Sequence, residues 1–450
     1  MNLPRSTPAE QGVDVTGIDA FVAAVDELGQ AELHSLMVLR HGHVVAEGWW
    51  SPYRPETPQL LYSLSKSFTS TALGLAVAEG MIDLDATVLS YFPELDARVS
   101  DPRSRATLVR HVASMASGHA GDQVDPASEA GSGDLLLGLL SIPPDQDPGT
   151  IFAYNQPCTY TLSAIIQRVS GQSLIEFLRP RLFEPLGIST YGWLTDRFGR
   201  QLGFSGLHVP TSAIAALGQL YLDGGRWQGA QLLPAGWAEE ASRLHIPTPD
   251  EENPDWNQGY GFQFWRSRHG YRGDGAYGQY MVILPEADAV VAITSQSPDM
   301  QGVLDALWTH LLPALTATGE LPAGRWEPGP LALTPPSGEG GLVSADHFAP
   351  SAANALPWLR SVEVRDGALL LTDDGLGLVV ALGDPGVWTA TGPVCAAHAA
   401  VDGVTRVELI FVETPHRLVL RLDPARHEFT ATWLAEPLHR APLAEMRMPR

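Results

Sequence analysis

The stretch YSLSKSF, residues 62–68, contains the only lysine of this 450-residue chain, Lys66, which lies three residues after Ser63. Apart from Lys66, every residue counted as lysine or arginine is an arginine. A guanidinium group stays protonated at any accessible pH, whereas a desolvated lysine amine can lose its proton, so only lysine can accept a proton from a hydroxyl group. The sequence therefore indicates a chemical role for Lys66. The alternative is that compositional bias left one lysine, which fell after a serine by chance.

Residues 63–79 are predicted to form a helix that Gly80 ends. Because residues three apart are neighbours on a helix, the Lys66 amine can reach the Ser63 hydroxyl. A serine hydroxyl becomes a good nucleophile when an adjacent base takes its proton, and a lysine made neutral by burial can be that base. The helix N-terminus adds amide donors where an oxyanion would form. Ser65 and Ser67 are rival nucleophiles, but neither has a lysine three residues later.

The composition excludes several classes of function. The formal net charge is -23 at pH 7, which disfavours nucleic acid or an anionic membrane as a partner. The first 30 residues lack the pattern of a secretory signal, and no apolar run approaches the ~20 residues of a membrane span. Cys158 and Cys395 offer neither a disulfide framework nor a metal cluster. We expect a soluble cytoplasmic protein without a metal or organic cofactor.

The order of predicted elements indicates an α+β fold. A strand hairpin near the start and a group of strands near residue 290 enclose a mostly helical stretch at about 85–250. This order predicts an antiparallel sheet built from both ends of the domain, flanked by terminal helices, with a helical lobe inserted and a cleft between sheet and lobe. The predicted strands are 33–39, 44–50, 261–267, 278–284 and 289–295, and the predicted helices are 18–28, 160–169, 214–222 and 303–315.

The last quarter of the chain differs in composition. Residues 320–341 are rich in proline and glycine and are predicted to be a linker that follows a domain at 1–319. Short strand-like runs divided by Asp-Gly and Asp-Pro turns then predict a small all-β appendage at 342–450, either a sandwich or a barrel. Its predicted strands are 361–364, 368–372, 376–382, 406–412, 417–422 and 428–433.

Two further stretches accompany the Ser-x-x-Lys pair: PGTIFAYNQ at 148–156, and GDGAYGQ at 273–279. These three elements, in this order, resemble those of the serine β-lactamase and penicillin-binding-protein superfamily. The sequence is most similar to class C β-lactamase-like serine hydrolases, which include esterases, D-amino-acid peptidases and nylon-oligomer hydrolases. The resemblance covers about residues 8–316, including MASGH at 115–119, and leaves the appendage outside.

The resemblance implies a role for each matching residue. Ser63 matches the family nucleophile, Lys66 the general base, and Tyr154 the tyrosine that relays protons to the leaving group. The backbone N–H groups of Ser63 and Ala276 match the oxyanion hole. The segment Gly273-Asp274-Gly275 matches the strand that binds substrate beside it.

Two positions depart from the family pattern. Gln156 stands where asparagine is usual, so the side chain expected to contact a substrate amide is longer. Gly273 replaces the cationic or imidazole residue that holds a substrate carboxylate, and strand alternation directs Arg272 to the other face. Together with Asp274, this loss disfavours penicillin-like and D-alanyl substrates. It favours esters, or amides with a neutral or amine-bearing end.

The sequence thus predicts a hydrolase that acts on a small-molecule ester or amide through an acyl-enzyme on Ser63. A β-lactamase or D-alanyl carboxypeptidase is the alternative within the same class. A catalytically inactive binding protein, with the β appendage as its working part, is the alternative from another class. A Ser-His-Asp hydrolase using His119 or His208 is disfavoured because the chain has no Gly-x-Ser-x-Gly elbow. The oligomeric state stays open.

Overall fold

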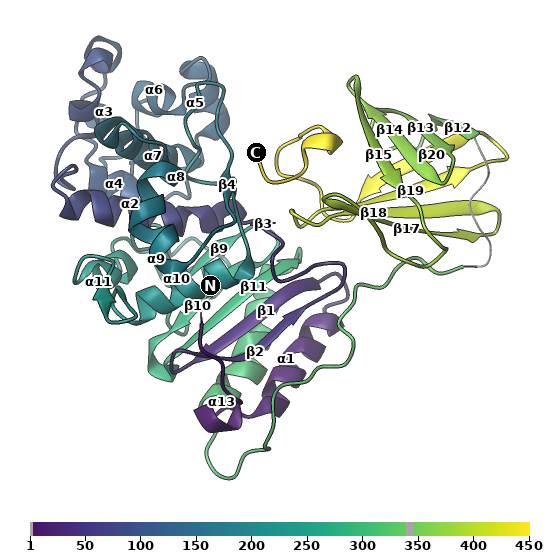
Figure 1. The fold of residues 1–450 in the computed structure, drawn as a ribbon. Coiled ribbons are helices and arrows are strands. Elements are labelled where there is room, and N and C mark those ends of the chain that lie inside the picture. Colours follow the sequence, from purple (N-terminus) through teal and green to yellow (C-terminus); the bar gives the residue numbers. More distant parts are fainter. Residues whose placement is uncertain (1–2, 339–345) are drawn as a thin grey trace.

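The computed structural model describes residues 3–338 and 346–450. It consists of an α+β body with a helical lobe and, beside them, an all-β appendage (Figure 1). The chain passes through the body first and enters the appendage after helix α13, Leu312–Leu315. The predicted fold class is therefore confirmed.

A six-stranded antiparallel sheet forms the centre of the body, in the order β2-β1-β11-β10-β9-β8. Its first and last strands in sequence meet at the middle, where Leu36 of β1 pairs with Ile293 of β11. This pairing is the predicted assembly of one sheet from both ends of the domain. The strands are β1 Glu32–Arg40, β2 His43–Trp49, β8 Trp265–Arg266, β9 Tyr271–Gly275, β10 Gln279–Leu284 and β11 Ala289–Gln296.

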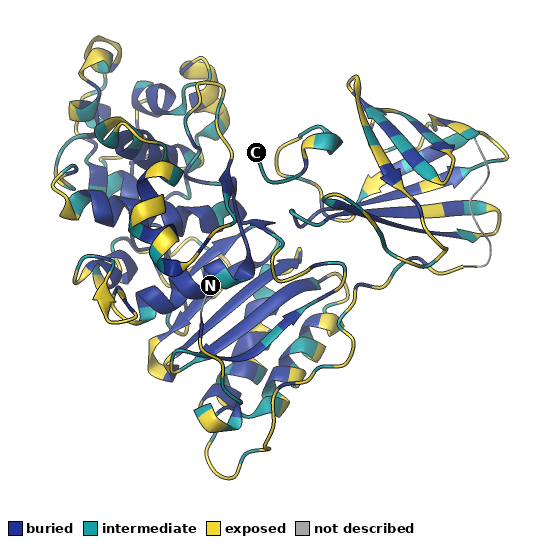
Figure 2. Ribbon diagram, viewed as in Figure 1, coloured by how far each residue is buried: buried dark blue, intermediate teal, exposed yellow. Residues whose placement is uncertain are grey.

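Helices cover both faces of this sheet, and Figure 2 shows its central strands almost wholly buried. Alternate side chains of one strand enter different cores, so Val38 packs with one helical layer and Leu39 with the other. The first layer consists of α1 Val15–Glu27, α12 Met300–Ala306, η7 Leu307–Leu311 and α13; the second includes α10 Thr211–Leu222. The flanking helices that the sequence predicts are thus present.

One predicted strand is largely wrong. Residues 261–267 were expected to be extended, but only Trp265–Arg266 forms a strand. Gln263 has a φ of 65°, a left-handed conformation that interrupts an extended run. The flanking Phe262 and Phe264 are buried and give the stretch its strand-like composition. Strand β9, which lies outside the three runs predicted near the end of the domain, occupies the place beside β10.

The inserted lobe contains most of the helices. Strands β3 Gln59–Leu60, β5 Leu207–Val209 and β4 Gly192–Trp193 form a short sheet between the lobe and the body. The helical segments are η2 Tyr62–Leu64, α2 Ser65–Ala78, η3 Val88–Tyr91, η4 Pro93–Arg98, α3 Pro102–Arg105, α4 Val109–Ala113, α5 Val124–Ala130, α6 Leu135–Ser141, α7 Gln156–Ser170, α8 Leu174–Leu178, η5 Arg179–Phe183, α9 Glu184–Leu186 and α11 Trp237–Ser242.

The described part of the predicted linker lies against the body. Trp326 donates its indole N–H to Asp19, and Ala332 forms a β-bridge with Ser51. Residues 339–341 of this stretch lie outside the described residues. The boundaries at 319 and 341 stay predictions.

The appendage is one curled nine-stranded sheet, in the order β15-β14-β13-β12-β20-β19-β18-β17-β16. Its two edge strands approach each other, and the N–H of Ala381 donates to Thr391 Oγ1 at 2.9 Å. We call this unit the barrel, and residues 434–450 after it the tail. The strands are β12 Asp346–Pro350, β13 Leu359–Arg365, β14 Ala368–Asp373, β15 Leu376–Ala381, β16 Thr389–Thr391, β17 Val394–Val401, β18 Val404–Phe411, β19 Arg417–Asp423 and β20 Glu428–Trp433.

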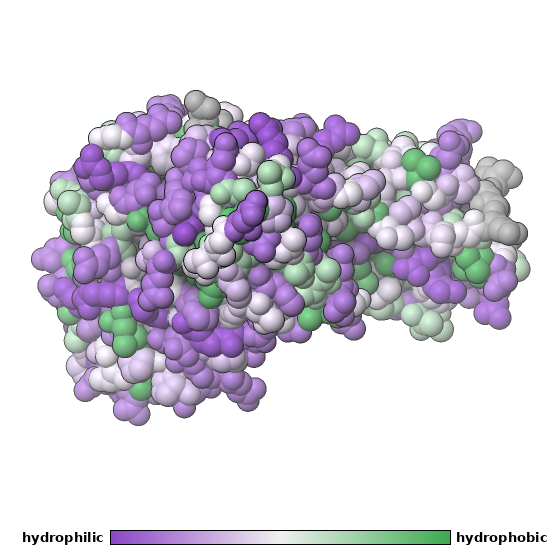
Figure 3. Space-filling view, turned by 90° about the horizontal axis from the view of Figure 1, so that it is seen from below, coloured by the Kyte–Doolittle hydropathy of each residue, from purple (hydrophilic) through white to green (hydrophobic). Residues whose placement is uncertain are grey.

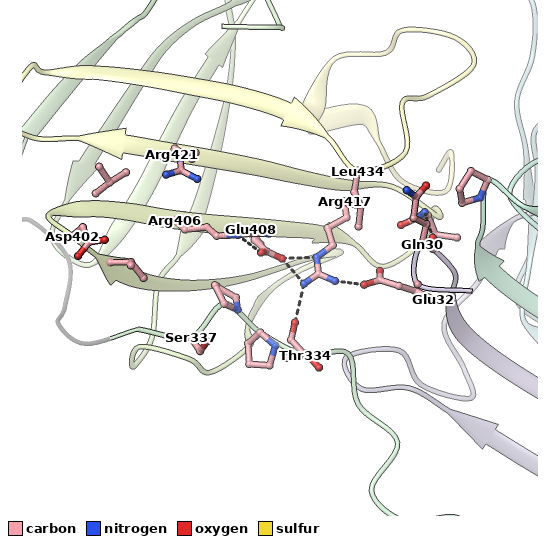
Figure 4. A pocket seen from close by; sticks show the side chains of 17 residues that line it. Gln30, Glu32, Thr334, Ser337, Asp402, Arg406, Glu408, Arg417, Arg421 and Leu434 are labelled. Atoms are coloured by element: carbon pink, nitrogen blue, oxygen red, sulfur yellow. Dashed lines mark hydrogen bonds and ion pairs between the residues drawn. The ribbon is translucent and has the colours of Figure 1, made fainter. Parts of the chain in front are cut away.

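A buried ion network joins the barrel to the body (Figure 4). Arg417 Nη1 donates to Glu32 of β1 at 2.5 Å, and Arg417 Nε donates to Glu408 of β18 at 2.6 Å. The guanidinium also donates to the carbonyl of Thr334 at 2.9 Å. Burial raises the pKa of Glu32, against the opposing effect of Arg417. The network lines a cleft of about 840 Å³ and fixes where β19 begins relative to the body.

The face in Figure 3 is mostly hydrophilic, with hydrophobic residues in small separate groups. Within residues 3–338 and 346–450, none of the helices is long and apolar enough to cross a membrane.

Candidate active site

Ser63 lies in the short 3-10 turn η2, two residues before the α-helix begins at Ser65. The helix was predicted from residue 63, so its start is two residues later, and its end before Gly80, with a φ of 71°, is as predicted. Tyr62 and Leu64 are buried, whereas Ser63 between them is partly exposed. The hydroxyl of Ser63 therefore stands at a surface that a small molecule can reach.

The Lys66 amine contacts this hydroxyl. Its Nζ lies 3.0 Å from Ser63 Oγ, 2.7 Å from Gln156 Oε1 and 2.9 Å from the carbonyl oxygen of Phe204. A neutral amine has two hydrogens and one lone pair. The two carbonyl oxygens can accept both hydrogens, which leaves the lone pair toward the Ser63 hydroxyl.

Burial lowers the pKa of Lys66 to about 7, against the opposing charges of Asp122 and Asp274 and of Cys158. Lys66 is 2% exposed, so bulk water cannot solvate its charged form, and the neutral amine is favoured. At neutral pH about half of the Lys66 amines are uncharged. The sequence prediction required this proton-accepting state.

Tyr154 lies in the extended segment before α7 and contacts both residues. Its ring centroid is 4.7 Å from Lys66 Nζ, and its ring stacks on Trp265 at 5.3 Å. Burial raises the pKa of Tyr154, against the opposing effect of a hydrogen bond to Ser63. The residue is thus a neutral phenol within reach of the Ser63 hydroxyl.

Gln156 begins α7 and accepts a hydrogen bond from Lys66. Besides its contact with Lys66, its backbone N–H donates to Asp122 Oδ1 at 2.9 Å. The sequence placed the Gln156 side chain toward a substrate amide. That role stays a prediction, because in the structure its carbonyl oxygen faces Lys66.

Two glycines let strand β9 approach the turn η2 that carries Ser63. A Cβ atom on Gly275 would lie 2.0 Å from the carbonyl oxygen of Leu61, and one on Gly273 would lie 2.4 Å from Ser67 Oγ. A side chain at position 273, where the resemblance implies a cationic residue, would therefore require the Ser67 and Leu64 side chains to move. Ala276 follows directly after β9 and, like Ser63, is partly exposed.

Arg272 and Asp274 face away from the two glycines and pair with each other. Arg272 Nε donates to Asp274 Oδ2 at 2.9 Å, and the guanidinium lies 4.3 Å from the ring of Trp256. Asp274 is 6% exposed, and burial raises its pKa, against the opposing effect of Arg272. Contact of Asp274 with a substrate stays a prediction. In the structure Asp274 pairs with Arg272, and this buried pair lies on the face of β9 opposite to the turn η2.

His119 and His208 have other partners. Among the described residues, His119 bonds to Ser117 at 3.0 Å and to the carbonyl of Ile142 at 3.1 Å, and His208 bonds to the carbonyl of Gly206 at 3.1 Å. Burial lowers the pKa of His208 to about 4. These contacts give no support to a histidine base beside Ser63.

Sequence reasoning missed three contributors to the site. Asp122 is the charge that most strongly raises the pKa of Lys66, the carbonyl of Phe204 accepts from the lysine, and Trp265 supports the Tyr154 ring. Asp122 accepts from the backbone N–H of Val124, the first residue of α5, so its position near a helix start indicates a structural role rather than a catalytic one. A backbone carbonyl leaves no signal in residue type.

Two hollows open beside these residues. One of about 360 Å³ is lined by Tyr154 together with Asp250 and Glu251. The other, of about 540 Å³, is lined by Tyr62, by Leu194 and Leu202 of the lobe, and by the tail. The hollows thus adjoin the site at Tyr62, which precedes Ser63, and at Tyr154, whose ring lies beside Lys66.

Comparison with known proteins agrees with this arrangement. The family model described as Beta-lactamase matches residues 18–315. The 6-aminohexanoate-dimer hydrolase of Paenarthrobacter ureafaciens is 28% identical over 322 residues, 66% of this chain and 81% of that protein. Esterase EstB of Burkholderia gladioli is 27% identical over 182 residues, 35% of this chain and 46% of that protein.

A solved structure extends the likeness in fold beyond the body. The structure of SurE with D-Leu has a TM-score of 0.51 and 21% identity, and the match covers 88% of this chain and 98% of that one. A match of this length extends past the body into the barrel. Because the family model matches more than half of the chain, over a span that includes residues 62–68, 148–156 and 273–279, the protein belongs to the Beta-lactamase family, and its sequence relatives named above are hydrolases.

Proposed function

We propose that the protein is a serine hydrolase that cleaves an ester or amide bond through an acyl-enzyme on Ser63. The observation that carries this proposal is the 3.0 Å contact between the Ser63 hydroxyl and the buried amine of Lys66. A desolvated amine with a pKa of about 7 can act as a base at physiological pH.

The residues divide the reaction between them. Lys66 takes the proton of Ser63 as its oxygen attacks the carbonyl carbon, and the N–H groups of Ser63 and Ala276 stabilise the resulting oxyanion. Tyr154, a neutral phenol, gives its proton to the leaving group and is reprotonated from Lys66, which thereby returns to the neutral amine. Water then attacks the acyl-enzyme, with Lys66 again accepting a proton, and the acid is released.

The site favours an ester, or an amide with a neutral or amine-bearing end. Gly273 offers no cation for a substrate carboxylate, and Arg272 is occupied by Asp274. Asp250 and Glu251 place negative charge in the hollow beside Tyr154, where an amine would be attracted. The 6-aminohexanoate-dimer hydrolase among the relatives, and a D-aminopeptidase of Brucella anthropi that is 26% identical over 205 residues, support testing amides as well as esters.

A fluorophosphonate probe and a substrate panel test the proposal together. We expect the probe to add one phosphonyl group, located by mass spectrometry on Ser63 and absent from Ser63→Ala. Turnover is expected among p-nitrophenyl esters and D- or L-aminoacyl amides. Folded protein that leaves the probe unreacted would favour a binding protein. Faster turnover of nitrocefin, with a penicilloyl adduct on Ser63, would favour the β-lactamase alternative.

The pH profile provides a separate prediction. A protonated Lys66 cannot accept a proton, so kcat/KM should be low in acid, rise through an apparent pKa of about 7 and level off above it. Asp122 raises the pKa of Lys66, so Asp122→Asn should move the rise to lower pH while its amide oxygen still accepts from the Gln156 N–H. A profile that is flat between pH 5 and 9, or that Asp122→Asn moves upward, would contradict Lys66 as the base.

A further inference from the structure

Two bulky residues next to the proposed oxyanion amides have left-handed backbone conformations. Tyr62, directly before Ser63, has a φ of 48°, and Tyr277, directly after Ala276, has a φ of 67°. Such conformations cost about 1–3 kcal/mol each and persist only where the surroundings hold them. Whatever holds these two tyrosines also sets where the N–H groups of Ser63 and Ala276 point.

The side chains of both tyrosines are held by the C-terminal part of the chain. Tyr62 Oη lies 2.5 Å from Nε2 of His416, which directly precedes β19. The hydroxyl of Tyr277 donates to the carbonyl of Glu436 in the tail. The three rings also meet edge to face, with centroid distances of 5.6 Å for Tyr62–Tyr277, 5.8 Å for Tyr62–His416 and 5.4 Å for Tyr277–His416.

His416 is itself fixed in one state. Its Nδ1 bonds to the carbonyl of Ala435 at 2.9 Å, so Nδ1 carries the hydrogen and Nε2 accepts from the Tyr62 hydroxyl. The side chain is 1% exposed, and burial lowers its pKa to about 4, so the imidazole is neutral where the enzyme is expected to act. The neighbouring Arg417 is held to the body by Glu32 and the carbonyl of Thr334. The imidazole thus stands on a rigid support.

We propose that the barrel and tail hold the oxyanion hole in shape, with His416 as a positioning residue that acts through Tyr62. The carbonyl of Glu436 acts in the same way through Tyr277. This inference rests on the proposed function, because it assigns a role in that reaction to residues outside the body. The working part of the appendage is then its contact with the site rather than a separate ligand.

The test compares three changes with a matched control. His416→Phe keeps a ring but removes the acceptor, Tyr62→Phe removes the donor, and the double variant removes both. Tyr53→Phe is the control, because its hydroxyl also bonds to the barrel, at the carbonyl of Thr414, but its neighbours in sequence are not the proposed oxyanion residues. His416→Gln offers an amide in place of the imidazole and tests for rescue.

Each variant is measured by the rate and the amplitude of fluorophosphonate labelling at Ser63, and by kcat and KM on an active substrate. We expect His416→Phe and Tyr62→Phe each to lower kcat and the labelling rate about 10- to 100-fold with KM within twofold, since small displacements of catalytic groups cost rates of this size. The double variant should be no slower than the slower single one, because both remove one contact. Tyr53→Phe should match the wild type, and His416→Gln should recover part of the rate.

The readouts separate positioning from misfolding and from failure of the proposed function. Loss of folded protein lowers the amplitude of labelling and leaves the rate of the remaining molecules unchanged, which would overturn the positioning role. Unchanged kcat in His416→Phe, or additive losses in the double variant, would also overturn it while leaving the hydrolase intact. A wild-type protein that the probe does not label would overturn both proposals.

Discussion

Replacing Lys66 by arginine is expected to lower kcat/KM about 100- to 10,000-fold, the usual contribution of a general base. A guanidinium group stays protonated at every pH in which the protein is folded, so it cannot take the proton of Ser63. The contacts that the lysine makes with Gln156 and Phe204 are to carbonyl oxygens, which accept equally well from a cation. The variant therefore changes the chemistry more than the packing.

Steady-state kinetics across pH 5 to 10 checks this result. Ser63→Ala sets the background rate, and thermal unfolding of Lys66→Arg shows whether the fold persists. In Lys66→Arg, we expect both a low kcat/KM and no rise of kcat/KM through pH 7. Survival of most of the activity, with the same pH profile, would show that another group takes the proton.

Gly275→Ala is expected to lower the rate of Ser63 labelling at least about 100-fold and the free energy of unfolding by about 1–3 kcal/mol. The new Cβ atom would lie 2.0 Å from the Leu61 carbonyl oxygen and 3.1 Å from the Leu64 backbone nitrogen. Backbone atoms on both sides of Ser63 cannot rotate away. Either β9 or the turn η2 must move, and the amides of Ser63 and Ala276 are expected to move apart.

Gly273→Ala is the matched comparison on the same strand and face. Its Cβ atom would meet Ser67 Oγ at 2.4 Å and Leu64 Cδ1 at 2.5 Å, which are side-chain atoms that can shift by rotation. We expect a smaller loss, about tenfold or less in labelling rate. Equal losses in the two variants, or a larger loss in Gly273→Ala, would contradict the close approach of β9 to the turn.

The parts of the site that lie close together in sequence were predictable. Ser63 and Lys66 are one turn apart, so their contact follows from helical spacing alone. Tyr154 and Ala276 required the resemblance to a family, because nothing in the spacing of residues 66, 154 and 276 places them together. Phe204 and His416 reach the site across 138 and 354 residues from their partners, and no local pattern encodes such a contact.

The composition of strands β9 and β17 explains why the sequence did not predict them. Strand β9 carries two glycines and a charged pair, residue types that are depleted in strands. The glycines are needed because β9 approaches the turn η2 closely, and the charged residues are accommodated because Arg272 and Asp274 pair with each other in the interior. In the barrel, β17 is rich in alanine, a weak strand former, although its side chains are buried. Burial in the assembled barrel stabilises it, and a single strand read in isolation does not show that burial.

The burial of the single lysine has a practical consequence for following motion in this enzyme. Because the chain has one ε-amine and that amine is 2% exposed, reductive methylation at residue 66 requires a transient opening of the surrounding side chains. The rate of methylation at Lys66, measured by mass spectrometry and distinguished from methylation of the α-amino group, reports how often such openings occur. A bound inhibitor should lower the rate of Lys66 methylation in proportion to its occupancy, which gives a binding assay that needs neither a chromophore nor turnover.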